Sequence, residues 1–476
     1  MANAAPKSLF FRHAAQLITL AGPPGPRRGA RLAELGIILR GGLLTQGEVI
    51  LRVGSARALE REARRLRAEV IDCGGRVVMP GFVDSHTHLV FASSRAADYE
   101  LRLEGKTYEE IARAGGGIQS SARKLRHTSA ALLKRQAQGF LEQMGAHGTT
   151  TVEVKTGYGL ETTQELKILR IIRSLQAETP LEIVPTLLAA HVVPDSFRGR
   201  SRQFLDEVVN RLIPLAAGAV VSPDAAPSSI FAAGPDFVRA PAAPWPTPYP
   251  ALKKVDRHSL KGVSTSTDQA PSEKLAEFID CFCDRGAFSV EDCRRVLEAG
   301  KQFGLIPRIH AEQLTHTGAA RLGIDCGAAS ADHLDQLTAA EIRALARSDV
   351  IATLLPGANF HLGLNRYPPA RKLIAAGAAV ALATDFNPGT SPTLNMQFIL
   401  SLACTQMRMT PAEAIVAATL NGACALRRGE RVGSLEAGKQ ADLIILDVPD
   451  YREIPYYFAI NHCVTTVKRG KVVYSR

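Results

Sequence analysis

The stretch Val83-Asp84-Ser85-His86-Thr87-His88 follows the apolar run Val77-Val78-Met79 and the breaker pair Pro80-Gly81. This order predicts a short buried strand that ends in two histidines. Because alternate residues of an extended segment point to the same side, the side chains of His86 and His88 should converge, as two ligands of one metal ion must. A lone His-x-His fits two hydrogen-bonded histidines equally well, so the interpretation depends on what other strand ends supply.

Eight apolar, strand-like segments follow one another between residues 82 and 385, and amphipathic helical segments separate them. Alternating strands and helices are typical of a parallel sheet, and eight such units favour a (β/α)8 barrel. The sequence therefore predicts an α/β protein built on a TIM barrel. The expected strands are Phe82–Asp84, Thr149–Lys155, Leu181–Leu188, Phe278–Phe282, Leu305–His310, Ala328–His333, Val350–Leu355 and Val380–Asp385.

Helix start and stop signals support this alternation. Serine, threonine or aspartate at a helix start, followed three residues later by glutamate, forms a capping box, and glycine commonly ends a helix. We expect capping boxes at Thr162/Glu165, Thr338/Glu341 and Thr410/Glu413, and helix ends at Gly148 and Gly377.

Short β-like runs also precede and follow the barrel. They lie at Gln16–Leu20, Leu35–Leu39 and Glu48–Val53, and again at Ala441–Leu446 and Val464–Tyr474. We expect one small composite β-sandwich domain built from both termini, residues 1–79 and 431–476, beside a barrel of residues 80–430.

Residues 217–271 interrupt the pattern with a dense run of prolines around the only tryptophan, Trp245. Such a composition cannot bury enough apolar surface to order itself, which predicts a disordered insertion. The segment falls between the third helix and the fourth strand, at the N-terminal face of a barrel.

The composition is that of an ordinary soluble enzyme, with 46% hydrophobic and 22% charged residues. The net charge of +11 reflects arginine-rich helical surface such as Arg57–Arg67, where glutamates are interleaved and aromatic stacking residues are absent. We therefore expect no nucleic-acid partner. We find neither a secretory signal nor an apolar run of about 20 residues, which predicts a cytoplasmic protein without a membrane partner.

Titratable side chains stand at the ends of several expected strands: His86, His88, His191, His310, His333 and Asp385. Active sites of these barrels lie at the carboxyl ends of the strands. Three histidines and a carboxylate suit zinc and iron alike, with water in an open position. Such a metal lowers the pKa of bound water to about 7 and yields hydroxide at neutral pH.

Asp385 would accept the proton of that water and pass it to a leaving nitrogen, and His333, if not a ligand, would polarise the carbonyl. Hydrolysis of a C–N bond is the chemistry that this set predicts.

Several motifs resemble the metal-dependent amidohydrolase superfamily, and more narrowly the imidazolonepropionase family. They span nearly the whole chain outside the proline-rich segment. The matching stretches include Pro80-Gly81-Phe82-Val83-Asp84, His86 to Arg95, Ala114 to Ile118, Gly148 to Leu160, Ala190 to Pro194, Phe282-Cys283, Ala383 to Pro392 and Gly433 to Leu443.

The resemblance implies hydrolytic opening of the ring of 4-imidazolone-5-propanoate to N-formimino-L-glutamate, in histidine degradation. It implies His86, His88, His310 and Asp385 as metal ligands, and it suggests a homodimer. The implied substrate contacts are Arg95, Tyr158, His191, Gln313, Asn387, Gly389 and Thr390. These residue types suit the substrate: a propanoate group calls for a forked cation such as Arg95, and a flat polar ring calls for hydroxyl and amide groups.

Several residues depart from the family pattern, among them Ser93-Ser94, which precede Arg95 where the family usually has glycine. Gln313 stands where some relatives carry glutamate, residues 356–361 form a polar loop, and Phe386 is bulky. Gln313 cannot carry a proton, which argues against a deaminase. The remaining alternative is another hydrolase or deaminase of a cyclic amide or amidine within the superfamily; a non-enzymatic scaffold would be free to lose ligands, and all of them are present.

Overall fold

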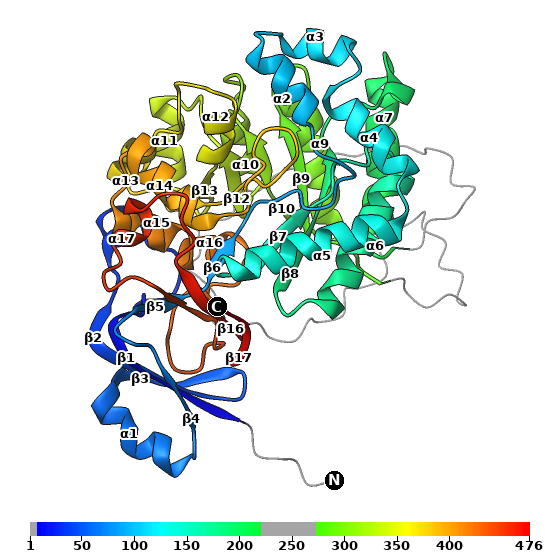
Figure 1. Ribbon diagram of the computed structural model, residues 1–476. Helices are drawn as coiled ribbons and strands as arrows, with labels where there is room; N and C mark the ends of the chain where they lie inside the picture. The colour runs from blue at the N-terminus through cyan, green and yellow to red at the C-terminus, as the bar shows by residue number, and fades with distance from the viewer. Residues whose placement is uncertain (1–6, 220–272) are drawn as a thin grey trace, which may run out of the picture.

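The computed structural model describes residues 7–219 and 273–476 (Figure 1). The predicted insertion of residues 217–271 therefore lies outside the described residues, except for residues 217–219. The described chain contains two sheets, one formed by both ends of the chain and one that forms the barrel. The first barrel strand begins directly after Pro80-Gly81.

The larger sheet is the predicted barrel, with its parallel strands in the order β14-β13-β12-β11-β9-β8-β7-β6. Its strands are β6 (Phe82–Asp84), β7 (Thr149–Lys155), β8 (Glu182–Ala190), β9 (Phe278–Cys283), β11 (Ile309–Ala311), β12 (Ser330–His333), β13 (Ile351–Leu354) and β14 (Val380–Leu382), and the short β10 (Ile306–Pro307) pairs with β9. All are almost entirely buried, as expected of strands covered on both faces.

The first and last strands meet through the residues that follow them. Thr87 forms a parallel bridge with Phe386. The His88 amide donates to the Phe386 carbonyl at 2.8 Å, and the Asp385 amide donates to the His86 carbonyl at 3.0 Å. These bonds bring the predicted metal ligands of strands one and eight side by side.

Helices surround the barrel (Figure 1). Those that cover the strands are α5 (Ala130–Ala146), α6 (Thr162–Glu178), α9 (Val290–Gln302), α10 (Ala319–Asp325), α11 (Ala339–Ala346), α13 (Ala370–Ala376) and α15 (Pro411–Ala417). Three helices follow β6 near the top of Figure 1: α2 (Ala96–Leu103), α3 (Tyr108–Arg113) and α4 (Gly117–His127). The stretch 356–361, expected as a loop, is the short helix α12 (Pro356–His361), which begins at a proline as helices often do.

Two of the three expected capping boxes are present, at Thr338/Glu341 and Thr410/Glu413. The third was wrong, because Glu161 stands at the N-cap of α6 and makes no side-chain cap. Glu165 instead accepts the amide of Gly157 at 2.7 Å, and so holds the loop after β7. Buried loop amides need acceptors, and Glu165 therefore bonds to the loop rather than to the N-cap of α6.

The smaller sheet combines both ends of the chain, as predicted, in the order β17-β16-β15-β5-β1-β2-β3, with β4 paired to β1. Its strands are β1 (Ser8–Ile18), β2 (Ile37–Gln46), β3 (Val49–Ser55), β4 (Glu69–Asp72), β5 (Val77–Pro80), β15 (Leu443–Leu446), β16 (Cys463–Lys468) and β17 (Lys471–Ser475). One face encloses a core of its own, which includes Phe11, Leu43 and Leu443. Helix α1 (Ala56–Arg65) packs on Phe10 and Leu44.

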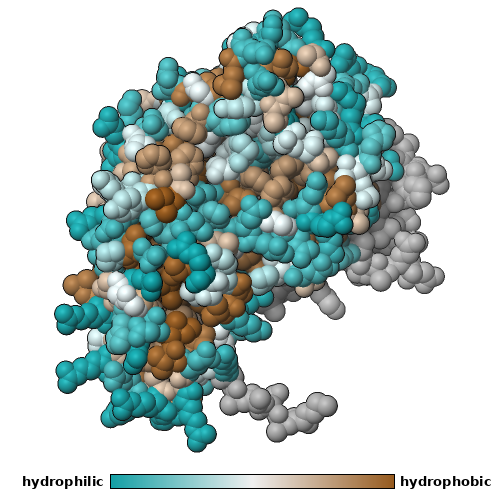
Figure 2. Space-filling model, in the orientation of Figure 1, coloured by the Kyte–Doolittle hydropathy of each residue, from teal (hydrophilic) through white to brown (hydrophobic). Residues whose placement is uncertain are grey.

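Hydrophilic residues cover most of the face in Figure 2, and apolar residues gather mainly on the β-sheet domain and where it meets the barrel. Within the described ranges, no helix is long and apolar enough to span a bilayer.

Candidate active site

The predicted metal ligands gather at the carboxyl ends of the barrel strands. The ligand atoms of His86, His88 and Asp385 all lie within 4.8 Å of one another, and those of His86, His310 and His333 form a second such group. The Nε2 atoms of His86 and His88 lie 3.6 and 3.7 Å from Asp385 Oδ1. His86 thus belongs to both groups, and His310 and His333 flank it.

The backbone at two of these positions is left-handed, with φ of 77° at His333 and 54° at Asp385. Left-handed conformations at side-chain-bearing residues cost about 1–3 kcal/mol each and gather at functional sites. Here they turn the chain sharply after β12 and β14, at the places where the two side chains face the cluster.

The residues fit a metal ion by their chemistry. His86 Nε2, His88 Nδ1 and His310 Nε2 are buried, and among the described residues none has a hydrogen-bond partner. Burial is the main reason why the pKa values of His86 and His88 lie well below the ordinary value, which keeps both rings neutral. Neutral imidazoles with unused lone pairs are what a metal requires of histidine ligands.

Buried carboxylates orient two of the imidazoles. Asp332 Oδ2 lies 2.7 Å from His86 Nδ1, and Asp280 Oδ2 lies 3.1 Å from His310 Nδ1. A carboxylate behind a ligating histidine fixes the tautomer and makes the opposite nitrogen a stronger donor to metal. The Nε2 atoms of both rings are thereby left for the ion.

Two buried cations neutralise these carboxylates. Lys155 Nζ lies 2.8 Å from Asp280 and 2.7 Å from Glu153, and Arg308 lies 3.1 Å from Asp332. Burial alone would raise the pKa values of Asp280 and Asp332. At Asp280, the neighbouring His310 and Lys155 outweigh burial and lower the pKa. At Asp332, Arg308 and His86 do the same. Both carboxylates are therefore ionised.

Asp385 has the opposite environment. Burial raises its pKa well above the ordinary value, while Asn387 and Lys155 oppose that rise. A carboxylate that holds a proton more readily than usual suits a group that must take up a proton and release it again. His333 is neutral, because burial and then His310 lower its pKa, and its Nδ1 has no partner among the described residues.

Four of the predicted substrate residues lie together beside Asp385. Asn387 donates to the Asp385 carbonyl at 2.7 Å and to Thr390 Oγ1 at 2.9 Å, and it accepts the Gly389 amide at 2.8 Å. A Cβ built on Gly389 would lie 2.5 Å from Arg95 Nη1, so only glycine lets the guanidinium come this close. Arg95, from the segment after β6, therefore places its guanidinium against the loop after β14, next to the predicted metal ligand Asp385.

The other predicted contacts surround the same cluster. The rings of Tyr158 and His191 lie 5.8 and 5.7 Å from the ring of His88. His191 Nδ1 lies 2.9 Å from the Gly157 carbonyl, and burial lowers its pKa to about 4. Gln313 is half-buried in the turn after β11. Phe386, a departure from the family pattern, packs its ring 4.9 Å from that of Phe140 and 5.7 Å from that of Phe91.

Sequence reasoning missed the buried ion network of Glu153, Lys155, Asp280, Arg308 and Asp332. A usable signal was present, because each charge interrupts or ends an otherwise apolar strand. Charged residues are seldom fully buried without partners. The five charged residues on these buried strands are therefore expected to form ion pairs with one another.

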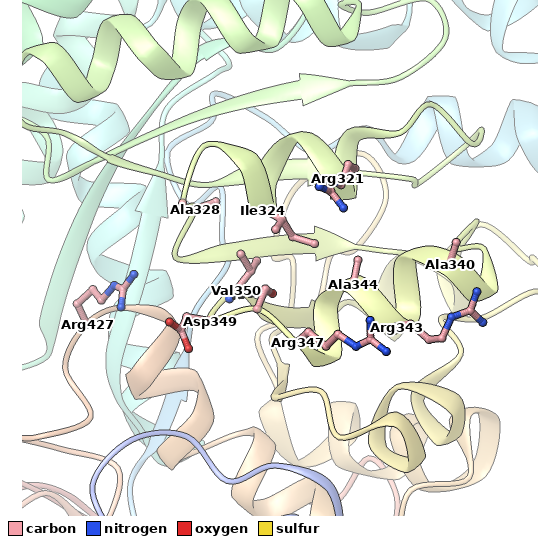
Figure 3. Close-up of a pocket in the computed structure, with 12 residues that line it drawn as sticks. Arg321, Ile324, Ala328, Ala340, Arg343, Ala344, Arg347, Asp349, Val350 and Arg427 are labelled. Atoms are coloured by element: carbon pink, nitrogen blue, oxygen red, sulfur yellow. Dashed lines mark hydrogen bonds between the residues drawn. The ribbon is translucent and has the colours of Figure 1, made fainter. Parts of the chain in front are cut away.

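A separate cavity of about 790 Å³ lies between α10 and α11, near the starts of β12 and β13 (Figure 3). Four arginines line it: Arg321, Arg343, Arg347 and Arg427. It contains no predicted site residue and lies at the amino ends of the strands, so it is distinct from the candidate active site.

Comparisons with known proteins agree with this architecture. The Amidohydrolase family matches residues 69–131 and 285–473. An adenosine deaminase of Xanthomonas campestris with bound zinc superimposes with a TM-score of 0.62 at 16% identity, over 99% of this chain and 94% of that chain. A triazine hydrolase variant superimposes with a TM-score of 0.69 at 16% identity, over 98% and 95%. At such identities these structures support the fold alone.

Sequence relatives are more specific. An imidazolonepropionase of Solibacter usitatus is 42% identical over 97% of both chains. One of Geobacillus kaustophilus is 41% identical over 98% of both. With such identity over nearly the full length, the chain belongs to the imidazolonepropionase family of metal-dependent amidohydrolases.

Proposed function

We propose that the protein hydrolyses 4-imidazolone-5-propanoate to N-formimino-L-glutamate. The observation that carries this proposal is the close approach of Arg95 to Gly389, a residue of the loop that also holds Asp385. An amidohydrolase site with a forked cation beside it suits a small cyclic amide that bears a carboxylate. The relatives named above carry the same activity in their names.

His86, His88, His310 and Asp385 would hold the metal. A bound zinc or iron ion would supply Lewis acidity and lower the pKa of a water molecule to about 7. Neutral imidazoles and one carboxylate suit both metals.

The chain's own residues would carry the proton transfers. Asp385 takes a proton from the attacking water, whose oxygen bonds to the ring carbonyl carbon. His333 stabilises the charge that develops on the carbonyl oxygen. The C–N bond of the ring amide then breaks, and Asp385 returns the proton to the leaving nitrogen. The position of its carboxylate beside His86 and His88, where the reacting water would lie, supports its use in both directions.

Substrate orientation would fall to the surrounding polar groups. Arg95 binds the propanoate carboxylate, and Tyr158, His191, Gln313, Asn387, Gly389 and Thr390 contact the ring and its exocyclic groups. No nucleic acid or membrane takes part in this scheme. A homodimer, suggested by the resemblance, is part of the proposal.

The test is an ultraviolet assay for consumption of freshly prepared imidazolone propanoate by the metal-loaded protein, beside an analogue whose carboxylate is replaced by a primary amide. We expect turnover of the acid and a kcat/KM about 10- to 150-fold lower for the amide, the equivalent of one charge-assisted contact. Turnover of a cyclic amidine or an exocyclic amine, without turnover of the imidazolone, would assign the alternative superfamily activity instead.

A further inference from the structure

Asp98 connects Arg95 to the start of a helix. One oxygen, Asp98 Oδ2, accepts from Arg95 Nε at 2.7 Å and from the Gly117 amide at 2.9 Å. Arg95 stands at the N-cap of α2, Asp98 lies in its first turn, and Gly117 is the first residue of α4. These segments follow β6 near the top of Figure 1. One carboxylate thus joins the predicted substrate cation to a second element of the active-site end.

The contact uses Nε, not the end of the guanidinium. In the described part of the chain, Arg95 has no other ion pair, so the edge formed by its two Nη atoms stays available for a carboxylate. Arginine binds carboxylates best through two parallel N–H groups. A partner at Nε leaves one such edge free and fixes the direction in which it faces.

The surroundings of Asp98 leave it little freedom. Its side chain is 15% exposed. A Cβ built on Gly116 would lie 2.5 Å from Asp98 Oδ1 and 2.8 Å from Ile111 Cγ2, so the glycine lets the turn close over the carboxylate. Burial alone would raise the pKa of Asp98, but the Gly117 amide and Arg95 outweigh burial and lower it. The group is therefore a fixed anion at the start of α4.

We propose that Asp98 is a positioning residue for substrate recognition. It orients the Arg95 guanidinium so that its Nη edge faces the substrate carboxylate beside Gly389. This inference rests on the proposed function, because it assigns Arg95 to that carboxylate. The competing account is that Asp98 only caps α4, and that Arg95 is merely its ion-pair partner.

Loss of a cap predicts an equal loss on substrates with and without a carboxylate. A pure charge effect and a loss of orientation predict opposite changes in KM for the acid. Removal of a negative charge next to Arg95 strengthens the local positive potential, so charge alone predicts tighter binding of an acid. Loss of orientation predicts weaker binding. Because a positioned cation binds substrate and transition state alike, the positioning account places the effect on KM rather than kcat.

The experiment compares Asp98→Ala and Asp98→Asn with the wild type, on imidazolone propanoate and on its primary amide analogue. The matched control is Glu100→Gln, an exposed carboxylate on the same helix without an ion pair among the described residues. For Asp98→Ala we expect KM for the acid to rise about tenfold, the low end for one charge-assisted bond, with kcat within about twofold. Asp98→Asn keeps a hydrogen-bond acceptor, so its KM for the acid should rise much less. KM for the amide should change little in either.

An unchanged or lower KM for the acid in Asp98→Ala overturns the proposal. So does an equal loss on both substrates, which is what capping of α4 alone predicts. If Asp98→Ala fails to fold, Asp98→Asn decides, since a KM for the acid below that of the wild type would show that charge rather than orientation dominates. Absence of turnover by the metal-loaded wild type would instead refute the proposed function.

Discussion

Asp385 combines two roles in one side chain, since its carboxylate lies within reach of His86 and His88 and its pKa is raised by burial. Substitution by asparagine removes the charge and the proton acceptor with little change in shape. We predict that Asp385→Asn lowers kcat by at least about 10²- to 10⁴-fold, the range for loss of a general base.

The measurement is steady-state turnover at matched metal content, with Asp195→Asn, a half-exposed carboxylate paired with Arg198, as the control. Near-normal kcat in folded, metal-loaded Asp385→Asn would remove Asp385 from the mechanism.

Asp332 contacts His86, a predicted metal ligand, at 2.7 Å. We predict that Asp332→Asn weakens metal affinity by about 10- to 100-fold, as changes behind ligating histidines usually do. Competition with a chromogenic chelator measures this, and Asp325→Asn, on the surface of α10, should leave affinity unchanged. Wild-type affinity in Asp332→Asn would mean that the His86 ring is held by its packing alone.

Strand and helix patterns were the most readable part of the sequence. The expected strand Thr149–Lys155 coincides with β7, because its threonines and valines are β-branched residues that favour an extended strand, and Gly148 precedes it. The Thr162/Glu165 box failed because the pattern cannot show that the Gly157 amide competes for Glu165. The pairing of His310 with Asp280 was also out of reach: β9 and β11 are neighbours in the barrel, but the sequence does not state the register between them.

The two chain segments that flank the predicted insertion lie close together. The Ala216 carbonyl accepts the amides of Leu275 at 2.8 Å and Ala276 at 3.2 Å, just before β9 enters the barrel from its amino end. Loop-closure entropy varies only slowly with length. We predict that joining the chain across an excision of Val220 to Gln269 with a short linker leaves metal content unchanged and kcat within about twofold.

Activity and metal analysis of the purified deletion variant test this. Loss of activity in a folded, metal-loaded variant would show that the excised residues serve the active site.

Glu182 connects the barrel to the terminal domain. Its carboxylate contacts Arg428 at 3.0 Å, Arg431, and Lys468 of β16 at 3.6 Å. Burial alone would raise its pKa, but Lys468 and Arg431 outweigh burial and lower it below 4.5. Removing one partner of a buried ion pair leaves unpaired charge, so Glu182→Gln should lower the free energy of unfolding by on the order of 3 kcal/mol at pH 7.

The pH dependence follows from the sign of the shift. A carboxyl with a depressed folded pKa contributes stability above its unfolded pKa, and loses that contribution as pH falls through the folded value. The difference between wild type and Glu182→Gln should therefore be full at pH 7 and shrink below about pH 4.5. Urea unfolding at several pH values measures it, with Glu142→Gln, an exposed carboxylate without an ion pair among the described residues, as a control. A difference that stays constant with pH would mean that Glu182 acts through packing rather than charge.

The strand ends of the barrel are expected to hold a metal that supports hydrolytic ring opening of imidazolone propanoate. The most direct measurement follows the loss of its ultraviolet absorbance with native protein, with protein stripped by a chelator, and with stripped protein given zinc or iron. We predict turnover in the first, none in the second, and recovery with about one equivalent of metal per chain in the third. Undiminished turnover by verified metal-free protein, or no turnover by the fully loaded protein, would contradict the account.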